Sequence, residues 1–114
     1  MNHHLREEMD RLHAEVCSAL ADPNRILILY LLEEKSQNVT EIMNNLELSQ
    51  PSVSRHLKVL RERNMVTPTR EGQTVVYSLR DKRVIQALDL LREMMAETFQ
   101  SQADLARRAQ SNQL

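Results

Sequence analysis

The stretch "SQPSVSRHLKVLRERNMV", residues 49–66, has the pattern of a helix with one apolar and one cationic face. Val53, Leu57 and Leu60 follow the i, i+4, i+7 spacing that places side chains on one side of a helix. The other face carries polar residues, namely Gln50, Ser52, Ser54, Arg55, Lys58 and Arg61. The stretch holds four Lys or Arg and one acid, whereas a solvated face usually mixes acids with bases. The composition therefore indicates a negatively charged partner.

The charge of the whole chain supports this interpretation. The 114 residues have a net charge of −1, but residues 50–83 hold eight Lys or Arg against three acids. The remainder holds seven bases against thirteen acids. We expect a basic face on an acidic body, a division that favours binding to a polyanion.

Length and composition predict one mainly helical domain over residues 1–114. Gly occurs once and Pro three times. The longest apolar run, Ile26–Leu32, is far shorter than the ~20 residues of a membrane span. The first ten residues lack the apolar segment of a signal peptide. We expect a cytoplasmic protein with no membrane contact.

Short elements surround the basic helix. Asp22 and Pro23 have the pattern of a helix start, and that helix continues through Glu34 with apolar residues on nearly every side, which predicts a place in the middle of the core. Residues 40–46 predict a short helix, and Glu47 begins a tight turn. Ser49 is the expected N-cap of the basic helix. Residues 66–79 predict a two-stranded hairpin around Gly72.

The first and last helices carry matching apolar seams with alternating steps of four and three residues. This spacing is typical of a helix that pairs with another helix. The predicted interface residues are Leu5, Met9, Leu12, Val16, Val84, Leu88, Leu91 and Met95. Beyond about residue 100 the chain is polar, and we expect a frayed tail over 100–114.

Two helices joined by a tight turn, the second of them basic, and a hairpin directly after them describe a winged helix-turn-helix. The fold class is therefore mainly α with a small β-hairpin wing. The segments "ALADPNRILILYLL", "SQPSVSRHLKVLRERNMV" and "REGQTVVYSLRD" together resemble the ArsR/SmtB family of winged-helix transcriptional repressors over roughly residues 15–98. The resemblance implies a homodimer, paired through the first and last helices, that binds an inverted-repeat operator in double-stranded DNA and releases it when an inducer binds. One departure is Glu47, where family members often have Gly or Asn; a left-handed backbone there would cost about 1–2 kcal/mol.

Within this interpretation Arg55 is the best candidate to recognise a base, because its planar fork matches guanine O6 and N7. Lys58 and Arg61 are expected to bind phosphate, and Arg70 and Gln73 flank the tip of the wing. The full set of predicted DNA-binding residues is Ser49, Gln50, Ser52, Ser54, Arg55, His56, Lys58, Arg61, Arg70 and Gln73.

No metal site or cofactor is predicted. A cysteine cluster that the family uses before the recognition helix is absent here. At a second family site the matching positions are Asp81, Arg83, Met94 and Glu97, where a cation replaces a ligand and a thioether suits zinc poorly. The inducer stays unidentified.

Cys17, the single cysteine, has two interpretations: a small buried hydrophobic residue, or a redox sensor. His3, His4 and His13 are better explained as solvated side chains than as ligands, since their spacing fits no metal site. Neither interpretation of Cys17 identifies an inducer.

Two other classes of protein compete with a DNA-binding regulator. A winged-helix module that binds protein would carry aromatic anchors, and the basic helix has none. An enzyme would show a phosphate loop or a nucleophile and base at useful spacing, and neither motif is present. We therefore expect no enzymatic activity.

Overall fold

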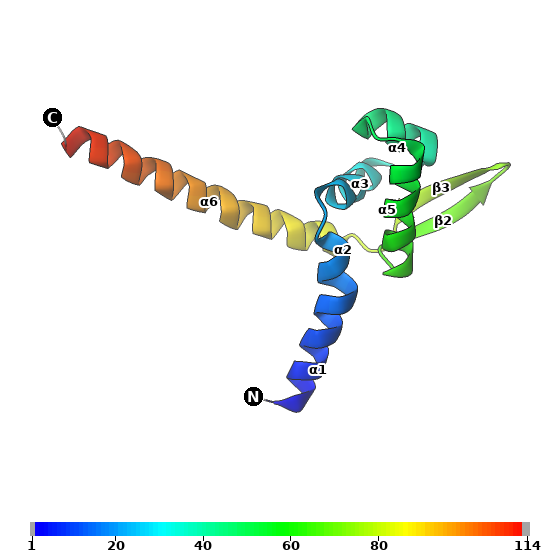
Figure 1. Cartoon of the computed structure of the whole chain (residues 1–114), viewed down its shortest axis with the longest axis horizontal. Coiled ribbons are helices and arrows are strands. Elements are labelled where there is room, and N and C mark those ends of the chain that lie inside the picture. Colours follow the sequence, from blue (N-terminus) through cyan, green and yellow to red (C-terminus); the bar gives the residue numbers. More distant parts are fainter. Residues whose placement is uncertain (1, 113–114) are drawn as a thin grey trace. The chain divides into compact units, whose positions relative to one another are not determined.

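The computed structural model describes residues 2–112 of the chain. The chain divides into two units, Met1–Lys82 and Arg83–Leu114, and Figure 1 shows the elements of each. The second unit consists of one helix, which has no core of its own. The prediction of a single domain over 1–114 therefore stays a prediction.

The first unit begins with a helix made of three segments: α1 (His3–Arg11), η1 (Leu12–Cys17) and α2 (Ser18–Leu20). The segment η1 is a π-helix, in which the Ser18 amide donates to the His13 carbonyl. Residues before and after such a segment do not continue one 3.6-residue period. The sequence predicts the helix, but contains no Gly or Pro that would have revealed its widened turns.

The helix α3 (Pro23–Glu34) starts as predicted: one carboxylate oxygen of Asp22 accepts from the amides of Asn24 at 2.8 Å and Arg25 at 3.4 Å. Ile28, Leu29 and Leu32 are buried. Leu27 is 48% exposed, so the expectation of a helix buried on nearly every side is wrong for that position.

The pair α4 (Val39–Leu46) and α5 (Gln50–Glu62) forms the helix-turn-helix. A capping box between Asn38 and Glu41 starts α4, and the Ser49 hydroxyl accepts from the Ser52 amide to start α5 as expected. Glu47 has a left-handed backbone with φ of 55°, and Asn64 ends α5 with φ of 61°. Both bends let the chain reverse within few residues.

The sheet has three antiparallel strands in the order β1 (Gln37–Asn38), β3 (Thr74–Leu79), β2 (Val66–Glu71). The predicted hairpin is present, with Gly72 at φ of 63° in its two-residue turn. The strand β1 was not predicted, because its two residues are too short to show alternation. Gln37 is nevertheless 1% exposed, and its side chain accepts from the Asn45 amide at 2.9 Å.

The second unit is α6 (Arg83–Asn112), a helix of 30 residues. It continues well past Gln100, so the helix is longer than the sequence predicted. The reason is its composition, since residues 100–112 are rich in Gln, Ala and Arg and contain no Gly or Pro. Its large exposed apolar side chains are Leu90, Leu91, Met94, Met95, Phe99 and Leu105.

These elements confirm the predicted fold class, a mainly helical winged helix-turn-helix. The strands β2 and β3 project beside α5 as the wing (Figure 1). Three helices and the sheet enclose the core of the first unit, which includes Ile28, Ile42, Leu57 and Leu60 at 1% exposure or less. This core holds α5 from one side and leaves its other side open.

Candidate nucleic-acid interface

The open side of α5 carries the cations that the sequence indicates. Arg55, Lys58 and Arg61 are exposed, as are Ser49 and Gln50 at the start of the helix. Ser52 and Ser54 are half-buried. One acid, Glu62, is exposed at the far end. The N-terminal two-thirds of this face therefore presents positive charge and hydroxyl groups without a carboxylate.

The helix is held rigidly from behind. Val53, Leu57 and Leu60 are 1% exposed or less, so α5 cannot rotate without opening the core. On the surface, the Gln50 amide donates to the Ser54 hydroxyl at 3.1 Å. This bond orients two polar side chains one helical turn apart, an arrangement suited to base edges.

The wing adds further polar groups at the tip of the hairpin that follows α5. Arg70 lies near the end of β2 and Gln73 in the turn, and both are exposed. The Arg70 Nε atom donates to the Gly72 carbonyl at 3.4 Å, which leaves its terminal nitrogens free of hydrogen bonds within the described chain. The predicted wing residues thus stay on the surface of the first unit together with those of α5.

His56 differs from the other predicted DNA-binding residues because it has a partner inside the protein. It is half-buried, and its Nδ1 atom lies 3.4 Å from Nη1 of Arg25. Sequence reasoning did not single out Arg25. The sequence feature that could have identified Arg25 is that it is a lone cation in an apolar helix, three residues after the N-cap Asp22.

Asp22 lies close to the same pair. Burial raises the pKa of its carboxyl, but the hydrogen bonds from Asn24 and Arg25 and the nearby charges of His56 and Arg25 outweigh it. The net effect is a pKa below the ordinary value, so this carboxylate is ionised at neutral pH. A negative group therefore faces the Arg25 guanidinium, whose Nη1 lies 3.8 Å from Asp22 Oδ2.

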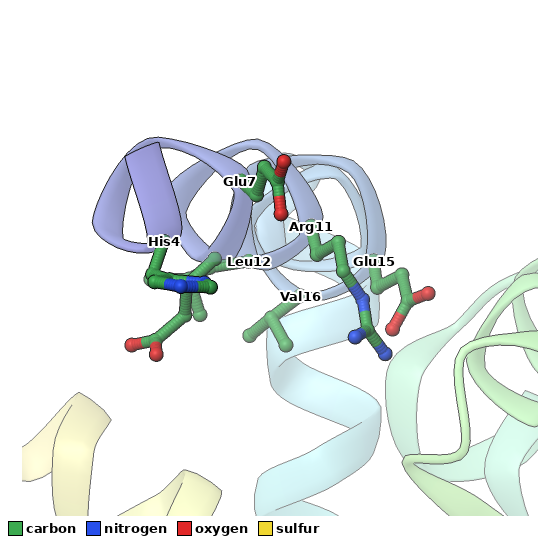
Figure 2. Close-up of a pocket in the computed structure, with 7 residues that line it drawn as sticks. His4, Glu7, Arg11, Leu12, Glu15 and Val16 are labelled. Carbon is green, nitrogen blue, oxygen red and sulfur yellow. The ribbon is translucent and has the colours of Figure 1, made fainter. Parts of the chain in front are cut away.

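Cys17 is exposed in the single chain, so the interpretation as a buried hydrophobic residue is wrong. Within residues 2–112, no three His, Cys, Asp or Glu side chains gather closely enough to hold a metal ion. Figure 2 shows a shallow pocket on the first helix with the labelled residues His4, Glu7, Arg11, Leu12, Glu15 and Val16. Glu8 also lines this pocket. Charges of both signs mix on this face, as on an ordinary solvated helix.

The predicted dimer seams are largely exposed. Leu5, Met9 and Leu12 are 40–44% exposed, and Leu91 and Met95 more than half. Leu88 is buried at 7% exposure, and Val16 and Val84 are half-buried. Across the part of the chain that the structure describes, no helix has the length and apolar composition to span a membrane.

Comparison with known proteins shows which family this chain is similar to. The family model described as "Bacterial regulatory protein, arsR family" matches residues 22–67, from the cap of α3 to the start of β2. The HTH-type transcriptional regulator NmtR of Mycobacterium tuberculosis is 40% identical over 76 residues, which cover 67% of this chain and 63% of NmtR. The chain therefore spans less than two thirds of that relative.

Other relatives are matched over nearly their whole length. The transcriptional activator HlyU of Vibrio cholerae is 33% identical over 97 residues, 82% of this chain and 90% of HlyU. A solved HlyU structure superposes with a TM-score of 0.67 over 77% of this chain and 96% of that one. The homodimeric winged helix-turn-helix DNA-binding domain Mb0332 of Mycobacterium bovis, at 24% identity, has a TM-score of 0.73 over 87% of this chain and 91% of that one.

Proposed function

Since the chain belongs to the ArsR family of bacterial DNA-binding transcriptional regulators, we propose that it is a sequence-specific repressor. It binds an inverted-repeat operator as a homodimer and releases it when an inducer binds. The observation that carries the proposal is the open face of α5, where Arg55, Lys58 and Arg61 are exposed beside hydroxyl groups and no large apolar side chain. Such a face suits a major groove, which offers base acceptors between two rows of phosphates.

Each exposed residue takes a role from its chemistry. Arg55 recognises a guanine through two parallel hydrogen bonds, and Gln50 and Ser54 contact neighbouring base edges. Lys58 and Arg61 neutralise phosphates, and Arg70 and Gln73 of the wing contact the adjacent backbone or minor groove. Ser49, Ser52 and His56 lie at the margins of this surface.

The homodimer rests on the exposed seams. Leu5, Met9 and Leu12 on the first helix, with Leu91 and Met95 on α6, are large apolar side chains that a second copy would cover. Two recognition helices about 34 Å apart would then enter successive major grooves, which requires an operator with two-fold symmetry.

The proposal is tested by selecting binding sites from a pool of random DNA duplexes with the full-length protein. We expect an inverted repeat to emerge. Arg55→Ala should then weaken binding to that duplex by roughly 1–3 kcal/mol and should weaken binding to a scrambled duplex much less. Fluorescence anisotropy at fixed salt measures both affinities.

Two results would contradict the proposal. If selection yields no consensus, sequence-specific binding fails, and the alternative of a winged-helix module that binds protein gains support. If Arg55→Ala weakens both duplexes equally, the base-reading role of Arg55 is wrong although the protein binds DNA.

The inducer is sought with the preformed complex, titrated with Zn(II) and then with hydrogen peroxide. Release by peroxide from the parent protein but not from Cys17→Ser would make the exposed thiol the sensor. Release by zinc from both proteins would contradict the prediction of no metal site. Transcription from a promoter that overlaps the selected operator distinguishes a repressor from an activator such as HlyU.

A further inference from the structure

Arg25 lies where three helices of the first unit meet. Its Nε atom donates to the Ala19 carbonyl at 2.8 Å, and its Nη2 atom donates to the Ser18 carbonyl at 3.1 Å. Its Nη1 atom lies 3.4 Å from Nδ1 of His56 on α5. The Arg25 side chain is only 16% exposed. One guanidinium on α3 thus joins the end of the first helix to the recognition helix.

The chemistry of each partner explains why an arginine occupies this position. The carbonyls of Ser18 and Ala19 belong to the last turn of the first helix, where helical amide partners run out. The Ser18 carbonyl also accepts from the Ala21 amide, but at a long distance of 3.4 Å. A planar guanidinium offers several N–H groups in fixed directions, so it reaches two carbonyls and a third acceptor together. Lysine has one nitrogen and cannot span the three positions. Asp22, with Oδ2 at 3.8 Å, balances the charge.

The contact also fixes the hydrogen-bonding state of His56. A guanidinium has donors and no acceptor, so the Nδ1 atom of His56 must accept. His56 is next to Arg55 in the chain and three residues after the buried Val53. A shift of the ring would therefore move the turn of α5 that holds the proposed base reader.

We propose that Arg25 is a positioning residue, which holds the turn of α5 around Arg55 in register with the end of the first helix through His56. This inference rests on the proposed function, because it states how the first helix, which we assign to the dimer interface, fixes the position of α5, which we assign to DNA binding. Arg25 itself contacts no DNA in this scheme. A misplacement of about 1 Å at a functional group is enough to weaken a geometrically demanding interaction strongly.

Loss of the Arg25 contact should affect DNA binding differently from loss of a phosphate contact. Without one phosphate contact, binding to all sequences is weaker and the salt dependence of log affinity falls by roughly 0.9. Displacing α5 weakens the selected operator, leaves a scrambled duplex nearly unchanged and leaves the salt dependence as it was. The two causes are therefore separable in one titration series.

Four variants of the full chain test the proposal. Arg25→Lys keeps the charge and removes the three-way contact. His56→Leu removes the acceptor at similar size, whereas His56→Asn keeps an acceptor near the position of Nδ1. Arg107→Lys is the matched control, since Arg107 is 69% exposed and pairs with Asp104 on the surface of α6.

Two measurements are made on each variant. The first is hydrogen–deuterium exchange of the α5 amides without DNA. The second is anisotropy with the selected operator and a scrambled duplex at several salt concentrations. We expect Arg25→Lys and His56→Leu to speed exchange in α5 and to weaken operator binding about tenfold, inside the roughly 5–150-fold range of couplings between sites. We expect His56→Asn to retain more operator affinity and slower exchange in α5 than His56→Leu, and we expect Arg107→Lys to behave as the parent protein does.

Three results would overturn the proposal. The first is parental exchange and affinity in Arg25→Lys. The second is a reduced salt dependence in His56→Asn, which would show that His56 acts on a phosphate. The third is equal weakening in His56→Asn and His56→Leu. If Arg25→Lys does not fold, the two His56 variants decide the matter by themselves.

The proposed function is judged separately. If the parent protein selects no consensus sequence, that proposal fails, and exchange in α5 without DNA still decides the coupling. If Arg55→Ala loses the operator and Arg25→Lys does not, the coupling fails and the proposed function stands.

Discussion

The helices α5 and α6 are both amphipathic, yet they expose opposite kinds of side chain. On α5 the apolar residues Val53, Leu57 and Leu60 are buried, and its exposed face is cationic. On α6 six large apolar side chains, from Leu90 to Leu105, are 52–66% exposed. The exposed face of α5 complements a negatively charged partner, whereas the exposed apolar side chains of α6 gain free energy by leaving water.

The difference shows that, in a single chain, the exposed face of α5 suits water whereas the exposed apolar side chains of α6 do not. The face of α5 is stable in water, because charged and hydroxyl groups are well solvated. Several large apolar side chains exposed on one helix, as on α6, are typical of a protein interface. The proposed assignments to DNA and to a second copy follow from this contrast, and changes confined to one face should affect one partner.

Leu91→Glu should have the largest effect, because it places a charge among the exposed apolar side chains of α6 that we assign to the dimer interface. Leu91 is 54% exposed in the single chain, so the variant should fold. In the dimer, each copy would bring a carboxylate into an apolar interface at a cost of several kcal/mol. We expect the dissociation constant of the dimer to rise by more than about 100-fold. Sedimentation velocity over a dilution series measures it.

The matched control is Gln86→Glu, which adds the same charge at an exposed α6 position outside the seam. It should leave the dimer intact. A dimer of unchanged strength in Leu91→Glu would reject the assignment of α6 to the interface. Binding to a duplex with half an operator should be nearly the same in parent and variant, because the face of α5 is untouched.

Lys58→Ala should weaken DNA binding by the exposed face of α5, with a smaller effect than that of Leu91→Glu on the dimer. Removing one phosphate contact from each protomer should lower the slope of log affinity against log salt concentration by about 1.8 in the dimer. Dimer mass should not change. Lys35→Ala is the control, since Lys35 is exposed at the end of α3. A slope equal to that of the parent would remove Lys58 from the residues that bind phosphate.

The sequence predicted most of the first unit, because its signals are local. Asp22 and Ser49 each act on amides within a few residues, and the structure confirms both as helix caps. The contact from Arg25 to His56 spans 31 residues of chain and has no periodic pattern. The strand at Gln37 exists only because β3 lies beside it. What sequence reasoning missed depends on tertiary neighbours.

Glu47→Gly should change the stability of the fold and leave the exposed faces of α5 and α6 as they are. Glu47 has φ of 55°, where a side chain is strained and glycine is not. We expect stabilisation of roughly 0.5–1 kcal/mol after the greater freedom of glycine in the unfolded chain is subtracted. Asn64→Gly, at φ of 61°, should gain less, because asparagine tolerates this conformation. Urea unfolding at fixed protein concentration compares the two. Equal gains would place the strain elsewhere than at Glu47.

Asp22→Asn should give the smallest effect, and its sign depends on pH. Asparagine caps a helix about as well as aspartate, so the variant loses only the charge. Because the pKa of Asp22 is lowered in the folded protein, its charge stabilises the fold above the unfolded value of about 3.9 and ceases to do so as the pH falls through the lower, folded value. At pH 7 the parent should be more stable by roughly 0.3–1 kcal/mol, through the helix dipole and Arg25. The advantage should vanish once the pH lies below the folded pKa of Asp22. Urea unfolding of both proteins across this range measures the difference. A difference that is constant with pH would mean that ionisation of Asp22 has no share in the stability of the fold, since its hydrogen bonds and its nearby cations both favour the charged carboxylate.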